Sequence, residues 1–312
     1  MQLVQQHIIK KSSESWRLID DMAYRSKNLY NATLYAVRQH FFKTSEYINY
    51  YSLQGQFQNT KQSDYVSMPA KVSQQIMKMV DQNFRAFFAA NKSYKNNPGK
   101  FNGRPKIPNY LDKTSGRFML IFTSQAISKS ALEKRGVLKM SGLDIEIKTG
   151  LSYNIINQVR IVKRLDSYII EIIYTIPDIQ KPDNGRYASI DLGLNNLAVV
   201  SSNVLKPVII SGKPLKSINQ FYNKRKAGLQ SKQKNNRSYN SKKIRKLTVK
   251  RNNKIKDYMH KASRLLVNHL VSNQINTLVI GHIKNWKQDI NMGKMNNQNF
   301  TQILFNMFIN ML

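Results

Sequence analysis

One carboxylate stands where the edge of a sheet would present it to a divalent cation. Asp191 follows a short apolar run and precedes Gly193 and a second β-branched run that begins at Leu197. This pattern predicts an aspartate at the end of a strand, where its oxygens can bind a metal ion. The same pattern also suits an Asx turn that caps a tight hairpin. The residues by themselves leave the two interpretations equal.

Other residue types that support catalysis are scarce. The chain has no cysteine, which excludes disulfide bonds, Cys-based zinc sites and a thiol nucleophile. After Asp191 the remaining acidic residues are Asp257 and Asp289, and no glutamate follows Glu171. His282 is a lone histidine, for which a structural role is the better interpretation.

The chain carries a large positive charge, with 50 Lys and Arg against 17 Asp and Glu and a formal net charge of +33. Nucleic acid is the usual partner of such a chain, because each neutralised phosphate releases counterions. A membrane surface is the competing anionic partner, but no apolar run reaches the roughly 18 residues that a spanning helix needs. The N-terminus lacks the long apolar run of a secretory signal, so we expect a cytoplasmic protein with no membrane partner.

The charge is concentrated between Lys213 and Arg264, where 18 Lys and Arg accompany a single acid, Asp257. The segment predicts two helices, at about 215–234 and 241–273. Like charges four residues apart destabilise an isolated helix, so contact with nucleic acid is favoured over a merely solvated face. The basic residues of this helical pair (213–273) that we expect to bind are Lys224, Arg225, Lys242, Lys243, Arg245, Lys250 and Arg251.

A second basic segment is NKSYKNNPGKFNGRPKIPN (91–109), whose three prolines and two glycines predict a loop rather than a helix. One interpretation is an exposed connector. The other is a loop that contacts phosphates and offers aromatic rings for base stacking. The residues that would serve this second role are Lys100, Arg104, Lys106, Tyr94 and Phe101.

Hydrophobic periodicity predicts the elements of the first half of the chain. A 3.6-residue period indicates a helix over about 16–42 and a second helix that opens at Ser67 and Pro69. Short β-branched runs between 117 and 177, together with a strand at 3–9, predict antiparallel strands of a small β-barrel or sheet.

The pattern of the second half predicts a strand, a turn and a second strand from Tyr187 onward. The two basic helices and a further strand at 277–281 follow. The chain ends in the apolar stretch ILFNMFINML, which must fold back on the sheet, bind a partner or stay exposed. Trp286 and Phe300 are expected to pack in the interior rather than to stack on bases.

Several segments resemble the TnpB family, transposon-encoded proteins related to type V CRISPR effectors. YASIDLGLNNLAVVSS (187–202) is similar to the first RuvC motif of that family. SLQGQF (52–57), MPAKVSQQIMKMVDQNFRAFF (68–88) and GKFNGRPKIPNY (99–110) resemble its recognition region. LVIGHIKNWKQDINMGKMNNQNFTQI (278–303) resembles the segment around its second RuvC motif. The resemblance spans essentially the whole chain in the family's order.

The resemblance implies an α+β multidomain fold. A wedge-like small β-barrel is expected from residues 1–15 and 112–185, with a helical recognition domain inserted at 16–111. A RuvC-type (RNase H-like) α/β domain, truncated at its C-terminal end, is expected at 186–312.

The resemblance also implies partners and chemistry. Members of the family bind an RNA made from the transposon end, which pairs with one strand of a double-stranded DNA target. Base pairing then supplies most of the sequence specificity. The family cuts DNA with divalent metal, so Mg²⁺ or Mn²⁺ is expected if the chain is active, without zinc. A bacterial, nucleoid-associated protein is implied.

The departures from the family decide the expected activity. Asp191 matches the first RuvC carboxylate, but Gly281 stands at the usual glutamate position, and the last RuvC motif and the zinc-ribbon cysteines are absent. Two-metal cleavage needs several carboxylates. We therefore expect an RNA-guided DNA-binding protein with an incomplete nuclease centre. One alternative is an active TnpB-like metal-dependent DNA endonuclease or transposition-associated protein, whose missing carboxylates come from a second chain or were lost by truncation of the gene. The other is a generic basic RNA-binding protein.

Overall fold

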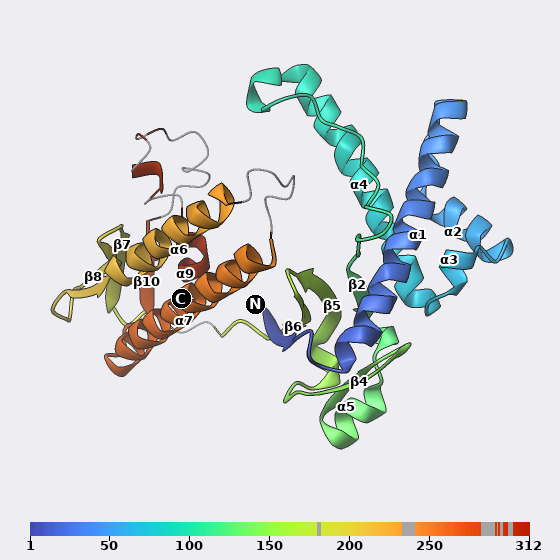
Figure 1. Cartoon of the computed structure of the whole chain (residues 1–312). Coiled ribbons are helices and arrows are strands. Elements are labelled where there is room, and N and C mark those ends of the chain that lie inside the picture. The colour runs from blue at the N-terminus through green and yellow to red at the C-terminus, as the bar shows by residue number, and fades with distance from the viewer. Residues whose placement is uncertain (180–181, 233–240, 282–290, 292, 294–295, 299–301) are drawn as a thin grey trace. The chain divides into compact units, whose positions relative to one another are not determined.

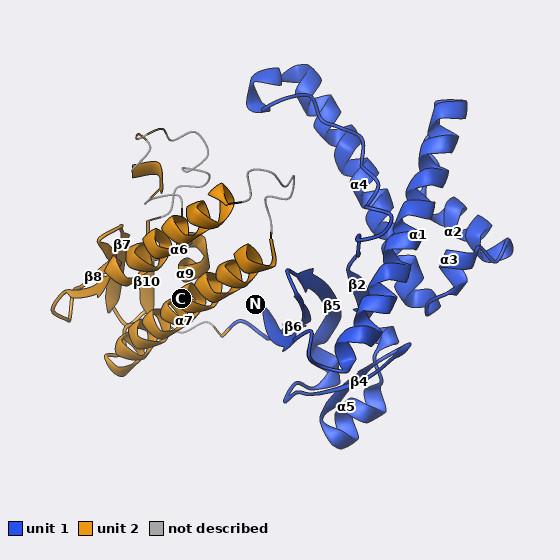
Figure 2. Ribbon diagram, viewed as in Figure 1, with its two compact units in different colours: residues 1–178 blue, residues 179–312 orange. Residues whose placement is uncertain are grey.

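The protein forms two compact units, residues 1–178 and 179–312, each with its own hydrophobic core (Figures 1 and 2). The computed structural model describes residues 1–179, 182–232, 241–281, 291, 293, 296–298 and 302–312. Among these residues, no helix is long and apolar enough to cross a membrane.

The first unit is built on a four-stranded antiparallel sheet in the order β1-β6-β5-β2. These strands are β1 (Gln2–Ile9), β2 (Leu120–Thr123), β5 (Ile156–Arg164) and β6 (Ser167–Thr175). β5 and β6 form the predicted hairpin, with Leu165 in the left-handed conformation at its turn. β1 runs along the other side of β6, with Gln2 opposite Thr175. The two ends of this unit's sequence therefore meet in one sheet.

The predicted β-barrel is not closed. β3 (Val137–Met140) and β4 (Leu143–Lys148) form a separate two-stranded sheet, beside the short helix α5 (Lys129–Arg135). β1 and β2 are the outer strands of the larger sheet and do not pair with each other. A barrel needs its first and last strands to join with a consistent stagger, and strand periodicity in the sequence carries no information on that closure.

Four helices lie between β1 and β2, namely α1 (Ser15–Thr44), α2 (Tyr50–Asn59), α3 (Ser63–Val66) and α4 (Ala70–Asn96). The periodicity of α1 and α4 is confirmed, because the apolar residues that recur near a 3.6-residue spacing are buried or half-buried in both helices. α4 runs further than expected, so the loop predicted from residue 91 is wrong over 91–96. No proline or glycine interrupts these residues, and the first helix breaker is Pro98.

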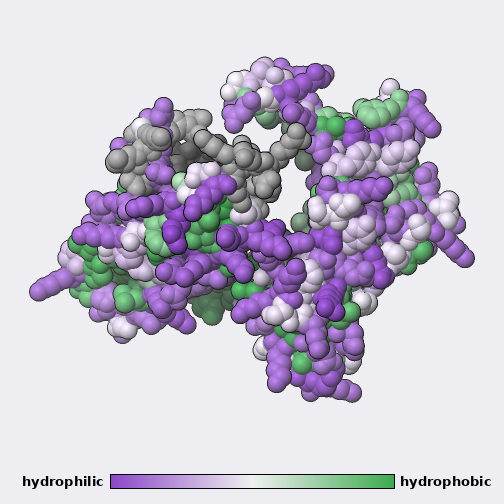
Figure 3. All heavy atoms as spheres, viewed as in Figure 1, coloured by the Kyte–Doolittle hydropathy of each residue, from purple (hydrophilic) through white to green (hydrophobic). Residues whose placement is uncertain are grey.

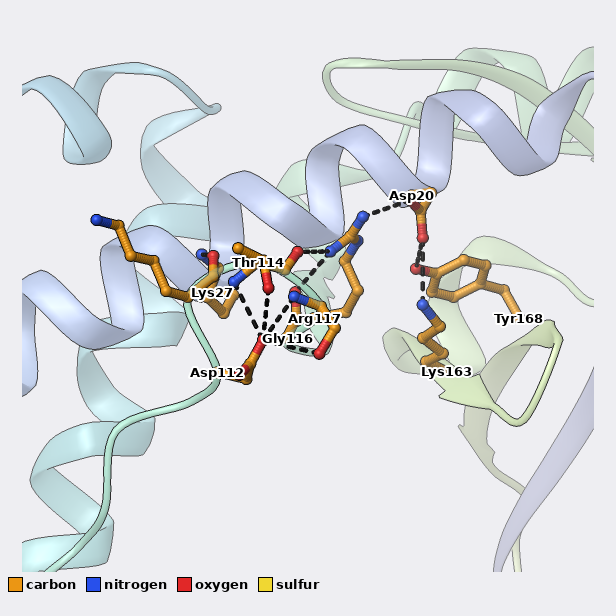
Figure 4. A network of polar contacts seen from close by, with 10 residues as sticks. Asp20, Lys27, Asp112, Thr114, Gly116, Arg117, Lys163 and Tyr168 are labelled. Atoms are coloured by element: carbon orange, nitrogen blue, oxygen red, sulfur yellow. Dashed lines mark hydrogen bonds and ion pairs between the residues drawn. The ribbon is translucent and has the colours of Figure 1, made fainter. Parts of the chain in front are cut away.

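A polar network ties α1 to the strands (Figure 4). Asp20 Oδ2 accepts a hydrogen bond from Arg117 Nη2 at 2.8 Å, and its Oδ1 accepts one from the Tyr168 hydroxyl at 2.6 Å and lies 3.4 Å from Lys163 Nζ. Nearby, the almost fully buried Lys27 donates to the carbonyl of Lys113 at 2.7 Å. Buried charges need such partners, so the network positions the helical insert against the sheet.

The second unit has a mixed sheet in the order β10-β7-β8-β9. Its strands are β7 (Tyr187–Leu192), β8 (Asn196–Ser202), β9 (Val208–Ser211) and β10 (Thr277–Ile280). β7, β8 and β9 form an antiparallel meander, and β10 pairs with β7 in parallel. Ile190 and Val279 therefore lie in one sheet, as the fold prediction requires.

Two long helices pack on this sheet, α6 (Lys213–Ser231) and α7 (Lys242–Ser272). The side chain of Ser241 caps α7 by accepting from the Ile244 amide. The C-terminal apolar segment folds back into the same core, where Ile303, Phe305 and Phe308 are almost completely buried around α9 (Phe305–Ile309). Of the three outcomes expected for this segment, the structure has the first.

Candidate nucleic-acid interface and carboxylate position

Asp191 lies at the carboxyl end of β7 on its outward face. Ala188 and Ile190 point into the core, so the alternation of the strand leaves Asp191 exposed, opposite Val199 of β8. The predicted placement at a strand end is confirmed. No Asx turn is formed through this side chain, since Asp191 is itself part of the strand ladder. The carboxylate is therefore accessible to a ligand.

Position 281 lies at the same edge of the sheet. Ile280 of β10 is in register with Ile190 of β7, and the two strands run in parallel. Gly281, the next residue after Ile280, therefore lies beside Asp191, the next residue after Ile190. A Cβ built on Gly281 would meet no atom within 4 Å. The sequence therefore supplies no carboxylate beside Asp191, although the described surroundings have room for one.

The described residues do not assemble a two-metal site. Within the described ranges no three His, Asp or Glu side chains gather where they could hold a metal ion. Asp257 is on the exposed surface of α7, where it forms an ion pair with Lys261 at 2.9 Å. The predictions for His282, Trp286, Asp289 and Phe300 fall outside the described residues.

A cationic groove runs between α6 and α7. The two helices are joined where the hydroxyl groups of Tyr222 and Thr248 lie 3.1 Å apart. Beside this contact is a hollow of about 670 Å³ with no acidic side chain in its lining. We call this hollow the cationic groove. It is lined by Lys224, Arg225, Gly228, Leu229, Lys232, Lys243, Lys246, Leu247 and Lys250.

The seven basic residues predicted on this helical pair have different surroundings. Lys224, Arg225, Lys243 and Lys250 are exposed and line the cationic groove, whereas Lys242 is exposed outside its lining. Arg245 is half-buried. Arg251 is hydrogen-bonded within the unit. The contribution of each residue to binding stays a prediction.

Arg251 connects three segments of the second unit. Its guanidinium donates to Asn219 Oδ1 of α6 at 2.8 Å, to Asn252 Oδ1 at 3.0 Å and to the carbonyl of Gln302 at 3.3 Å. The group also lies over the ring of Tyr222. Burial lowers the pKa of Arg251, yet the group stays charged at neutral pH. These contacts give Arg251 a structural role.

An apolar hollow continues from the cationic groove along the same two helices. It has a volume of about 290 Å³ and shares Leu247 and Lys250 with the groove. Two aromatic residues line it, Tyr222 and Phe221, and Phe221 is 61% exposed. Phe221 was not predicted from the sequence, and the signal that was available is a large aromatic residue in a helix rich in Lys, Asn and Gln.

The three basic residues predicted to contact phosphates in the loop after α4 are all exposed, namely Lys100, Arg104 and Lys106. The two aromatic residues predicted for base stacking instead contact each other, since the rings of Tyr94 and Phe101 meet edge to face with centroids 5.6 Å apart. Both rings are half-buried. Their faces are therefore less accessible to a base than that of Phe221.

Most of the second unit matches a known protein family. The family model OrfB_IS605, described as a probable transposase, matches residues 171–287, a region that contains Asp191, α6, α7 and β10. No curated protein sequence matches the chain.

Two solved structures also align with the chain. A Cas12f1-sgRNA-target DNA complex aligns over 94% of this chain and 71% of that chain, with 13% identity and a TM-score of 0.49. A CRISPR-Cas12f ternary complex aligns over 94% and 68%, with 13% identity and a TM-score of 0.32.

Proposed function

Since the chain belongs to the OrfB_IS605 or TnpB family of probable transposases, we propose that it is a transposon-derived, RNA-guided DNA-binding protein. Its own residues supply an incomplete nuclease centre. The observation that carries the proposal is the cationic groove, with six Lys and Arg and no acid in its lining. On this proposal the second unit is a RuvC-type domain, and the helices between β1 and β2 contribute to recognition.

The physical basis of binding is the phosphate backbone. A groove lined by cations of two helices can follow a strand of phosphates, and release of the counterions favours binding without reading any base. In an RNA-guided protein this is sufficient, because base pairing between guide and target supplies the specificity. The proposed partners are an RNA made from the transposon end and a double-stranded DNA target.

The described carboxylates of this chain are too few for the two-metal chemistry of the family. Mg²⁺ and Mn²⁺ sites for phosphodiester cleavage need several carboxylates that hold two ions about 4 Å apart. The described residues provide Asp191 alone at the end of β7, with Gly281 beside it. Mg²⁺ keeps most of its waters and binds weakly to a single ligand. We therefore propose that the chain binds its target without cutting it.

Binding is tested by neutralising part of the cationic groove. We expect Lys224→Ala, Lys243→Ala and Lys250→Ala together to weaken binding of RNA and DNA. The dependence of log K on log salt should flatten by roughly one unit for each lost phosphate contact. The matched control removes three exposed cations of the same unit that lie outside the groove, Lys206, Lys213 and Arg264. Equal slopes in wild type and the groove variant would contradict the proposal.

Cleavage is tested with the purified chain, its co-purified RNA and a matched DNA target in Mg²⁺ or Mn²⁺. We expect the DNA target to be bound by the protein and to remain uncut. The control is Asp191→Ala, which should bind as the wild type does. Metal-dependent cutting that disappears in this control would show an active endonuclease, with further ligands from Asp257, Asp289 or a second subunit.

A further inference from the structure

The apolar hollow beside the cationic groove has the composition of a base-stacking site. Its lining includes Ile218, Phe221, Tyr222, Leu247, Lys250 and Lys254. Arg251 also lines the hollow, and Lys250 and Lys254 are exposed residues. In the space-filling view, hydrophobic atoms are exposed between α6 and α7 among hydrophilic ones (Figure 3).

Phe221 is available to a ligand, whereas the neighbouring aromatic residue is not. Tyr222 contacts Thr248 through its hydroxyl, and its ring lies under Arg251 and Lys226. Phe221 is largely exposed, whereas Ile218, about one turn earlier in α6, is partly buried and packs against the core of the unit. An exposed phenylalanine keeps apolar area in water, which burial under a flat ring would remove.

The two hollows together offer both parts of a nucleotide site. Phe221 provides a ring face for a base, and Lys250, which lines both hollows, provides a cation beside it. A base-paired duplex presents its phosphates but keeps its base faces stacked, so only an unpaired nucleotide can use both parts. Resting on the proposed function, we propose that α6 and α7 bind an unpaired stretch of nucleic acid, with one base stacked on Phe221 and the adjoining phosphates in the cationic groove.

This arrangement predicts that the two hollows affect binding in different ways. Replacing Phe221 should reduce the extra affinity that unpaired bases provide, without changing how the affinity depends on salt. Replacing the cations of the groove should change the salt dependence of the affinity for any strand. The charge of Lys254 on the rim of the apolar hollow should assist the stacked nucleotide, because that residue lines this hollow and not the groove.

The test measures binding of the full chain to three fluorescent probes of equal length: a mixed-sequence single strand, its blunt duplex, and a strand of abasic sites with the same phosphates. The single strand is tested both as RNA and as DNA. The form whose affinity falls more in Phe221→Ala identifies whether the stacked nucleotide belongs to RNA or to DNA. We expect Phe221→Ala to weaken the single strand by roughly tenfold and to leave the abasic strand and the salt slope unchanged. Phe221→Trp should restore binding.

Controls separate stacking from folding. Leu265 of α7 is exposed and apolar, as Phe221 of α6 is, but lines neither hollow, so Leu265→Ala should bind as the wild type does. Equal weakening of the single strand and the abasic strand by Phe221→Ala would overturn the proposal, as would unchanged binding of the single strand. If the wild type binds none of the three probes, the proposed function itself fails.

Discussion

Asp20 shows how a single carboxylate fixes the helical insert to the sheet. Its two oxygens are bonded to Arg117 and Tyr168, which come from segments on either side of α5, β3 and β4 in the chain. Burial raises the pKa of Asp20, but the hydrogen bonds from Arg117 and Tyr168 and the charge of Lys163 outweigh it, so that the pKa lies below its usual value. The folded state therefore favours the ionised carboxylate.

We predict that Asp20→Asn lowers the free energy of unfolding of the first unit by about 1–3 kcal/mol at pH 7, since it leaves Arg117 without its charged partner. Because the pKa of Asp20 is lower in the folded than in the unfolded state, the ionised carboxylate stabilises the fold at pH values above its unfolded-state pKa, near 4. This stabilisation is lost as the pH falls through the folded-state pKa. The difference between wild type and variant, measured by urea denaturation, should therefore shrink below about pH 4. The adjacent Asp21 forms an exposed pair with Arg25, and Asp21→Asn should change little.

Gly281 offers a second test on the scale of one residue. Because a Cβ there meets no atom within 4 Å, we predict that Gly281→Glu folds and binds Mn²⁺ more tightly than the wild type. Two carboxylates at the ends of adjacent strands would then share the ion. Titration calorimetry measures the affinity, and adding Asp191→Ala should abolish the gain. No gain would show that position 281 does not reach the same ion as Asp191.

On the scale of the element, two neighbours on α7 are expected to behave differently. Lys250 lines the cationic groove, whereas Arg251 is bonded to Asn219 and to the Gln302 carbonyl. We predict that Arg251→Ala lowers the midpoint of thermal unfolding of the second unit, because buried acceptors lose their donor. Lys250→Ala should leave this midpoint near wild type and reduce the salt slope of binding instead. The reverse pattern would exchange the roles of the two residues.

The elements were more predictable from the sequence than the surfaces between them. The apolar period of α1 and α4, the β5–β6 hairpin and the strand-end position of Asp191 all follow from local patterns. The open sheet and the different surroundings of Lys250 and Arg251 depend on which element packs where. Phe221 was missed for the same reason, since an exposed ring gains meaning only from the second helix beside it.

For the whole molecule, charge is distributed unevenly between the two units. Residues 179–312 hold 24 Lys and Arg against 4 Asp, a net charge of +20, while residues 1–178 account for the remaining +13. Like charges at this density repel one another in the folded state, and salt screens them over a Debye length of about 10 Å at 0.1 M.

We predict that the midpoint of thermal unfolding of the free protein rises with added NaCl between low and moderate ionic strength. Scanning calorimetry across a salt series measures it. The groove variant Lys224→Ala, Lys243→Ala and Lys250→Ala should show a smaller rise, since it starts with less repulsion. A midpoint that falls with salt would show instead that ion pairs contribute more to stability than repulsion removes.

The pairing of β1 with β6 sets the order in which the protein can take shape during synthesis. Gln2 faces Thr175, so β1 is synthesised before its partner strand and stays unpaired until nearly the whole first unit has been made. Unpaired strands in nascent chains are prone to aggregate. Helices α1 to α4 can fold meanwhile from local contacts, and in doing so they shorten the span of chain that must close. We therefore expect the helical insert to assist the folding of the sheet that surrounds it in sequence.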